Sequence, residues 1–281
     1  MKVLGRTAGG LALGIGVLVG CFVLGDVGAI AGVVLAMLGF QALTRKVEGP
    51  AYVAGALATT AGLVTIAWIH GLGATELGLG HTTWITGLLW SAGIVLGIGA
   101  VIGIAGGIPR LHKYFADDRN ADANGLLTTR RVLMDIPFGT VLVEEFAFRG
   151  VLLALVTQVW GTVWAVAITS LLFGLWHIGP ALEMHDAHQE AKSHVLVTVG
   201  TTVLFTGLSG VVFAGLRLFT GSLLPPAALH WAGNGTGLVV SFFVHRRLRR
   251  QQREWEHEAH EHAHDHDLPP GEQPPSGAGA A

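Results

Sequence analysis

Runs of about 20 apolar residues recur along the chain, and a run of that length crosses the hydrocarbon core of a bilayer as one helix. These runs lack the period-two alternation of barrel strands, so helices are the expected spanning element. The sequence therefore predicts an all-α, polytopic transmembrane helix bundle of about eight spans with a polar intramembrane cavity. The predicted spans are 8–25, 27–44, 51–70, 83–106, 132–156, 158–178, 194–219 and 222–244.

Composition agrees with a membrane protein. Charged residues make up 13% of the 281 residues, roughly half the share found in soluble domains. The single cysteine, Cys21, excludes an internal disulfide and a cysteine-based metal cluster. Leu18-Val19-Gly20-Cys21 resembles a lipoprotein cleavage box, but the apolar residues after Cys21 favour a retained first helix.

The basic residues predict the orientation. Of 17 Lys and Arg, all except Arg149 and Arg217 fall on one side of the eight predicted spans. By the positive-inside rule, that side and both termini are cytoplasmic. A composition rich in Ala, Gly and Val favours a bacterial plasma membrane. The expected organisation is four N-terminal spans in 1–109, a cytoplasmic loop in 110–131, a catalytic core of four spans in 132–244, and a tail in 245–281.

The expected tail is basic, then His-rich, disordered and cytoplasmic. Its low-complexity composition favours a solvated segment. A weak transition-metal site is the alternative, formed by His257, His260, His262, His264 and His266.

Three polar motifs interrupt the apolar runs of the last four spans. They are Glu144–Arg149, Phe173–His177 and His230–Asn234. A charged side chain at a helix centre costs about 2.5–3.5 kcal/mol on insertion scales, so such residues usually face the bundle interior and serve function.

Helix spacing divides the charges of the first motif. Glu145 and Arg149 are four residues apart, so they share a helix face and can form a structural ion pair. Glu144 is rotated by about 100° from Glu145 and has no local partner on its own helix. The third motif places His230 and Asn234 on one face, which predicts either a shared site or a helix–helix hydrogen bond.

The chemistry of these residue types fits activation of water. An unpaired carboxylate, Glu144, and an imidazole, His177, can take a proton from water. A second imidazole, His230, and the Asn234 amide can donate hydrogen bonds to an oxyanion. Glu144, His177 and His230 are also a plausible zinc set with an open position, so metal-free and metal-bound mechanisms both stay open. Alone, His177 would more often be an interfacial histidine.

The order EE-x-x-x-R-G, F-x-x-x-H and H-x-x-x-N resembles the CPBP intramembrane proteases, which include the type II CAAX prenyl endopeptidases and the Abi proteins. The motifs read Glu144–Gly150, Phe173–His177 and His230–Asn234, within roughly 130–244. The resemblance implies an intramembrane endopeptidase. It assigns water activation to Glu144 and His177, oxyanion stabilisation to His230 and Asn234, and supporting roles to Glu145, Arg149 and Phe173.

The expected partners are the lipid bilayer and a membrane protein or lipidated peptide as substrate, with no nucleic acid. Two other function classes stay open. The first is a membrane transporter or metal-handling protein with a His-rich tail, because buried polar residues also mark ion pathways. The second is a non-enzymatic immunity or scaffold protein.

Overall fold

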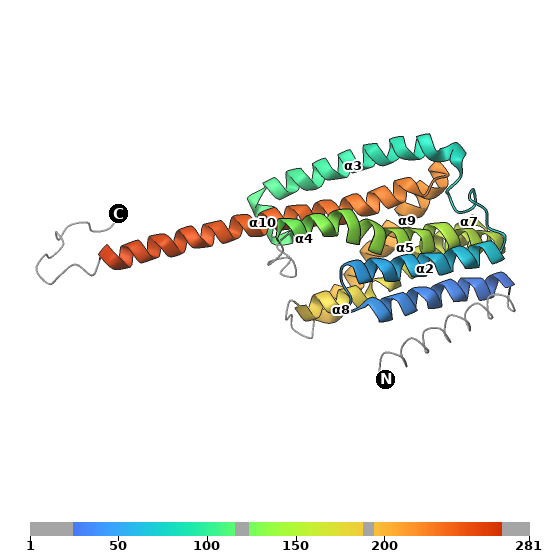
Figure 1. Cartoon of the computed structure of the whole chain (residues 1–281), viewed down its shortest axis with the longest axis horizontal. Coiled ribbons are helices and arrows are strands. Elements are labelled where there is room, and N and C mark those ends of the chain that lie inside the picture. Colours follow the sequence, from blue (N-terminus) through green and yellow to red (C-terminus); the bar gives the residue numbers. More distant parts are fainter. Residues whose placement is uncertain (1–24, 116–123, 188–193, 266–281) are drawn as a thin grey trace, which may run out of the picture.

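The chain forms a bundle of long helices that run back and forth along one direction (Figure 1). The computed structural model describes residues 25–115, 124–187 and 194–265, without the side chains of 184–187 and 258–265. This described part contains helices and no strand, which confirms the all-α fold. The predicted first span, 8–25, and the Leu18–Cys21 box lie almost wholly outside it.

The helix bounds follow the predicted spans closely. The first described helix covers Gly25–Thr44. The next elements are α2 (Pro50–Ile69), η1 (His81–Thr83), α3 (Trp84–Gly107) and η2 (Pro109–Tyr114). Residues 125–160 are then continuously helical as α4 (Gly125–Arg130), η4 (Arg131–Val141), α5 (Leu142–Glu145), η5 (Phe146–Leu152) and α6 (Leu153–Trp160). The last are α7 (Thr162–Trp176), α8 (Ile178–Ala187), α9 (Val195–Thr220) and α10 (Leu224–Asp265).

Five helices of the described residues are long and apolar enough to cross a membrane: Gly25–Thr44, Pro50–Ile69, His81–Gly107, Thr162–Glu183 and Val195–Thr220. The chain is therefore a multi-pass membrane protein. The helices over 125–160 and α10, which carry two of the polar motifs, are not among the five, and the total of eight spans stays a prediction.

Local sequence signals place the breaks between helices. Pro50 begins α2, where its missing N–H costs no hydrogen bond. The Asn124 side chain accepts from Leu127 N at 2.8 Å and caps α4. Gly161, with φ of 82°, separates α6 from α7, and Gly221, with φ of 67°, ends α9. Both glycines adopt a left-handed conformation that other residues disfavour.

The basic stretch of the tail is helical. α10 continues as a helix to Asp265 and projects beyond the bundle (Figure 1), past the predicted end of the last span at residue 244, while the Pro- and Gly-rich end predicted to be disordered, 268–281, lies outside the described residues. Arg, Gln and Glu dominate 246–258 and are good helix formers. A Gln252–Glu256 hydrogen bond of 3.1 Å joins side chains four residues apart. His257 is exposed; the side chains of His260, His262 and His264, and all of His266, lie outside the described residues.

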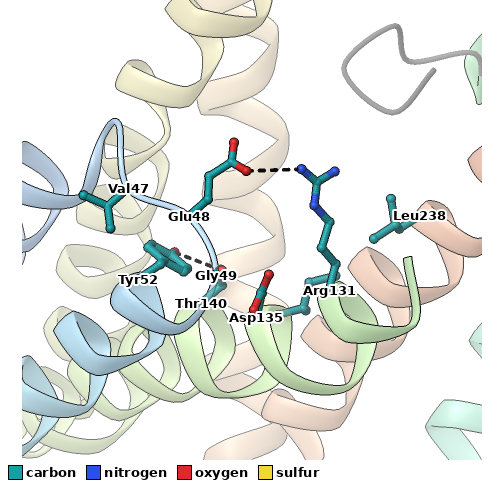
Figure 2. Close-up of a pocket in the computed structure, with 9 residues that line it drawn as sticks. Val47, Glu48, Gly49, Tyr52, Arg131, Asp135, Thr140 and Leu238 are labelled. Atoms are coloured by element: carbon teal, nitrogen blue, oxygen red, sulfur yellow. Dashed lines mark hydrogen bonds and ion pairs between the residues drawn. The ribbon is translucent and has the colours of Figure 1, made fainter. Parts of the chain in front are cut away.

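A polar cavity of about 470 Å³ lies where the turn before α2, the π-helix η4 and α10 come together (Figure 2). Charged and hydroxyl side chains line it, together with apolar groups: Val47, Glu48, Gly49, Tyr52, Arg131, Asp135, Ile136, Thr140 and Leu238. It lies at the end of the bundle where the 45–49 turn and the start of η4 meet, which is the end predicted to be cytoplasmic.

Helices α7 and α9 pack closely through small residues. A Cβ atom added at Gly210 of α9 would lie 2.9 Å from Ser170 Cα of α7. Gly174 of α7 is equally restricted, because its Cβ would lie 2.7 Å from Val203 O. Small residues let transmembrane helices approach in this way, and α7 carries one of the three polar motifs.

We expect Gly210→Ala to lower the free energy of unfolding by about 1–3 kcal/mol, because the methyl group would meet backbone atoms of α7. Gly215→Ala is the matched control on the same helix, since its Cβ would meet nothing within 4 Å. Thermal unfolding of the purified protein in detergent measures both. Equal melting temperatures for the two variants would contradict the close approach of α7 and α9.

Candidate active site

The first motif lies on a helix of unusual geometry. Residues 131–141 and 146–152 form π-helices, and α5, which contains Glu144 and Glu145, is a short α-helical segment between them. The Leu142 N–H donates to Pro137 O, five residues earlier, as a π-helix requires. Pro137 itself has no N–H to donate. π-helical turns occur frequently at functional sites, and here they flank both carboxylates.

Glu145 and Arg149 form the predicted ion pair. Arg149 Nη1 donates to Glu145 Oε1 at 3.1 Å, and both side chains are only 1% exposed. A charge this deeply buried is costly unless a partner compensates it. The structure therefore confirms the pairing that the four-residue spacing predicted.

Aromatic rings enclose the Arg149 guanidinium. Its central carbon lies 3.9 Å from the centroid of the Phe173 ring and 4.8 Å from that of Phe213. Cation–π contact of this kind is strongest where water is excluded. The Phe173 ring also lies at 4.7 Å from the His177 ring and 6.0 Å from the His230 ring, between centroids. Phe173, the first residue of the second motif, is thus the apolar centre of the site.

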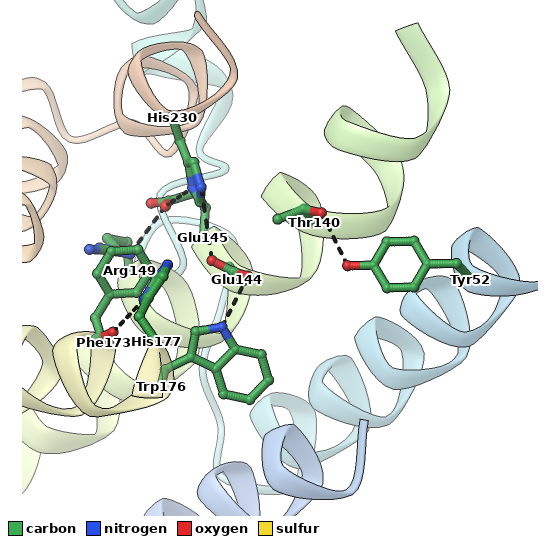
Figure 3. A network of polar contacts seen from close by, with 9 residues as sticks. All are labelled: Tyr52, Thr140, Glu144, Glu145, Arg149, Phe173, Trp176, His177 and His230. Carbon is green, nitrogen blue, oxygen red and sulfur yellow. Dashed lines mark hydrogen bonds and ion pairs between the residues drawn. The ribbon is translucent and has the colours of Figure 1, made fainter. Parts of the chain in front are cut away.

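His230 of α10 lies between the two carboxylates (Figure 3). Its Nδ1 is 2.8 Å from Glu145 Oε1, and its Nε2 is 3.9 Å from Glu144 Oε2. Because Glu145 Oε1 also accepts from Arg149, we assign Nδ1 as the donor. This assignment turns Nε2 toward Glu144 and fixes the ring on Glu145.

Glu144 has a partner that the sequence did not predict. Trp176 Nε1 donates to Glu144 Oε1 at 3.0 Å, and both side chains are buried. Glu144 Oε2 makes no hydrogen bond within the described residues. One oxygen is therefore fixed by the indole, while the other keeps its capacity to accept a proton. A buried Trp N–H usually finds a hydrogen-bond acceptor. The position of Trp176 in an apolar span was therefore the sequence feature that could have predicted this bond.

The remaining two predicted residues are placed differently. His177, at the end of α7, is half-buried, and its Nδ1 lies 2.8 Å from Phe173 O. Because a carbonyl only accepts, Nδ1 donates, and the neutral ring presents Nε2 as an acceptor. Asn234 is exposed, one turn along α10 from His230, and makes no hydrogen bond within the described residues. Glu144 and His230 thus lie close to each other. The rings of His177 and His230 both contact the ring of Phe173, and Asn234 lies at the exposed edge of the site.

The three residues predicted as metal ligands do not form a metal site in this arrangement. The described part of the chain contains no group of three His, Cys, Asp or Glu placed to hold a metal ion. His230 and His177 donate from Nδ1 to the Glu145 carboxylate and the Phe173 carbonyl, which leaves Nε2 of each ring as the atom that would coordinate a metal. Glu144, His177 and His230 thus form no three-ligand group in the described part of the chain, and a metal-bound form of the site stays a prediction.

Residues 130–236 match the family model of type II CAAX prenyl endopeptidases, Rce1-like. This match confirms the resemblance to the CPBP and CAAX proteases. Comparisons with curated proteins and with solved structures found no match.

The Rce1-like region begins at the last residue of α4 and ends within α10. It contains all three motifs, from Glu144 to Asn234, and both residues that the structure adds to them, Trp176 and Phe213. The match supports an intramembrane endopeptidase of the CAAX-protease type acting on a membrane-associated substrate. The helix Gly25–Thr44, α2 and α3 lie outside the matched range, although α2 packs against η4 and η5.

We expect Arg149→Met to destabilise the protein by about 3–5 kcal/mol, because it leaves the buried Glu145 carboxylate without its cation. The matched control is Arg45→Met, which removes an exposed pair with Glu183 and should cost about 0–1 kcal/mol. Denaturant unfolding in bicelles measures both. If Arg149→Met lowers the free energy of unfolding no more than Arg45→Met does, the Glu145–Arg149 pair is not buried as described.

Proposed function

We propose that the protein is an intramembrane endopeptidase in which Glu144 activates water to hydrolyse a peptide bond of a membrane-associated substrate. One observation supports this role above the others. Trp176 fixes one Glu144 oxygen, and the second oxygen is buried without a hydrogen bond among the described residues, facing His230. A positioned carboxylate with a free acceptor is the group that general base catalysis requires.

In the proposed first step, Glu144 Oε2 accepts a proton from water while the water oxygen bonds to the carbonyl carbon of the substrate. His177 contributes a second acceptor, because its Nδ1 donates to Phe173 O and its Nε2 keeps a lone pair. Both groups lie on helices that pack closely against their neighbours. The protein therefore needs to rearrange little when the water attacks.

The carbonyl oxygen becomes an oxyanion in the same step. We assign its stabilisation to the Asn234 amide, which is exposed and makes no hydrogen bond within the described residues. His230 can add a hydrogen bond from Nε2 only when its ring carries both protons, since Nδ1 already donates to Glu145. Glu145 and Arg149 then act as positioning residues that hold His230.

In the second step, the C–N bond breaks and the proton taken by Glu144 passes to the leaving nitrogen. The products are a carboxylic acid and an amine, which ionise to a carboxylate and an ammonium ion, and Glu144 returns to its charged form. Glu144 alone accepts and returns the proton in this sequence of steps, so the proposed steps need no other proton carrier.

An apolar pocket beside the site supports a substrate with a lipid-like or membrane-embedded part. The pocket has a volume of about 230 Å³. It is lined by Trp176 of the site and by Phe148, whose ring centroid lies 5.2 Å from that of Phe173. Its wall on the other side comes from the helix Gly25–Thr44. We therefore propose a lipidated peptide or a membrane protein as the substrate class, acted on in the plasma membrane with both termini cytoplasmic.

Glu144→Gln tests the proposed role. The substitution keeps an acceptor for Trp176 but removes the base, so we expect cleavage of a prenylated, fluorescence-quenched peptide to fall by roughly 10²–10⁴-fold. Thermal unfolding should be nearly unchanged. Retained cleavage by the purified, folded variant would overturn the proposed mechanism.

Trp176→Phe tests the indole hydrogen bond, because it removes the N–H and keeps an aromatic ring. We expect kcat to fall roughly tenfold, as for the loss of a hydrogen bond to a charged group, and the pH profile of kcat to move. Trp231→Phe is the matched control, because its Nε1 donates to a backbone carbonyl, Val132 O, at 2.9 Å. A pH profile that moves equally in both variants would show that Trp176 acts only through packing.

A further inference from the structure

A groove of about 410 Å³ lies between α3 and α10, at the end of the bundle from which α10 projects (Figure 1). Its walls are the last turns of α3, one residue of η2 and a face of α10 that begins at Thr236. The groove is therefore separate from the proposed active site. Apart from Thr236, it also lies outside the matched residues 130–236.

Glycines at the end of α3 give the groove its shape. A Cβ atom added at Gly106 would collide with the side chain of Val240, so α3 and α10 touch at this point. A Cβ atom added at Gly103 or Gly107 would meet nothing within 4 Å. The groove is open because these two lining residues have no side chain, and a larger residue at either position would fill part of it.

The segment η2 borders the groove where α3 ends. His112 Nε2 lies 3.0 Å from Gly106 O, and it is the donor because a carbonyl only accepts. This bond holds η2 against the last turn of α3. Arg110, Lys113 and Tyr114 of the same segment are exposed. Basic and tyrosine side chains at the end of an apolar helix are typical of the membrane–water interface, so this end of the groove lies at the level of the lipid headgroups.

The α10 side of the groove changes from apolar to basic along the helix. Val240 and Phe243 line its apolar part, and Arg247 lines it one turn further on. Arg250 follows on the same face, because residues three apart share a helix face. Arg247 is exposed and has no hydrogen bond or ion pair within the described residues, so its guanidinium can bind a ligand in the groove.

The arginines of α10 occupy a layer about as thick as the headgroup region. Residues 246–253 contain five arginines and no acidic residue. The positions from 246 to 250 cover about 6 Å along the helix, and each headgroup layer of a bilayer is roughly 5–8 Å thick. This end of the bundle is the one predicted to be cytoplasmic, and the cytoplasmic leaflet carries anionic lipids.

We propose that the groove between α3 and α10 binds one anionic phospholipid, with its phosphate on Arg247 and an acyl chain along the apolar part. This proposal does not depend on the proposed hydrolysis. The planar guanidinium of arginine matches the geometry of a phosphate, and the open space at Gly103 accepts the chain. A zwitterionic lipid fits less well, because its own cation would meet the same arginines. The bound lipid would join α3 to α10, the helix that carries His230.

A second copy of the chain fits the groove less well than a lipid does. Both copies have the same orientation in the membrane, so each would bring its arginines to the same level. Like charges placed against each other in an interface cost several kcal/mol. An anionic lipid instead neutralises the arginines and fills the apolar part.

Native mass spectrometry of the delipidated full-length protein tests the choice of lipid. The probes are phosphatidylglycerol and phosphatidylcholine with identical palmitoyl and oleoyl chains. We expect the first phosphatidylglycerol to bind roughly fivefold more tightly than phosphatidylcholine, as for one arginine near an anionic headgroup. Glycerol 3-phosphate has the anionic group without the chains and should not displace it. Equal affinities for the two lipids, or displacement by glycerol 3-phosphate, would overturn the proposal.

Arg247→Gln and Arg246→Gln form a matched pair. Both residues are exposed neighbours on α10, but only Arg247 lines the groove. We expect Arg247→Gln to weaken phosphatidylglycerol binding roughly fivefold and Arg246→Gln to leave it nearly unchanged. Equal losses in the two variants would show a diffuse basic surface in place of a site, and would contradict the proposal.

Gly103→Leu tests the apolar part of the groove. We expect it to weaken phosphatidylglycerol binding roughly tenfold, as for about two methylene groups excluded from the groove. Gly97→Leu is the matched control on α3, because a Cβ atom there also meets nothing within 4 Å and Gly97 does not line the groove. Unchanged binding in Gly103→Leu would overturn the proposal, as would a dimer that forms through this face in place of lipid binding. The arginine variants change only exposed side chains, so they remain informative if Gly103→Leu fails to fold.

Discussion

The buried pair of Glu145 and Arg149 is the interaction on which the arrangement of this site depends. Both side chains are almost completely excluded from the surface, so neither charge can exist there without the other. Each also has a second partner: Glu145 accepts from His230, and Arg149 lies over the ring of Phe173. Through these contacts one ion pair fixes the positions of α7 and α10 relative to the helix of the first motif.

In the proposed mechanism, the Glu145–Arg149 pair positions the reacting groups and takes no part in the proton transfer. Glu145 Oε1 accepts from both Arg149 and His230, and Oε2 of each carboxylate makes no hydrogen bond within the described residues. Glu144 differs from Glu145 because it has no cation as a hydrogen-bond partner and its Oε2 faces His230 Nε2 at 3.9 Å. Trp176 holds the first oxygen of Glu144, so the two adjacent carboxylates have different environments and different roles. In many enzymes, two neighbouring acidic residues have different roles because their surroundings differ.

The two ends of the bundle are built differently. At the end opposite the polar cavity, Arg217 donates to the carbonyls of Thr75 and Glu76. Leu77 of the same loop packs with the core near Gly150. This loop covers the active-site helix from that end. The polar cavity with Arg131 lies at the other end of the bundle.

Helix spans and the Glu145–Arg149 pair could be predicted because apolar run length and four-residue spacing are local properties of the sequence. The donor to Glu144 could not, because Trp176 and Glu144 are 32 residues apart and meet only through tertiary packing. The π-helices around α5 leave no periodic signal, and they alter which side chains share a face. The exposure of Asn234 and the Glu48–Arg131 ion pair likewise depend on how α2, η4 and α10 meet.

The most direct test of the central claim is an experimental structure of the Glu144→Gln protein with an uncleaved prenylated peptide. The account predicts that the carbonyl carbon of the scissile bond lies beside residue 144, with its oxygen toward the Asn234 amide and a water between the carbonyl and residue 144. A scissile bond bound away from residue 144, or a metal ion bound between residue 144 and His177, would contradict it.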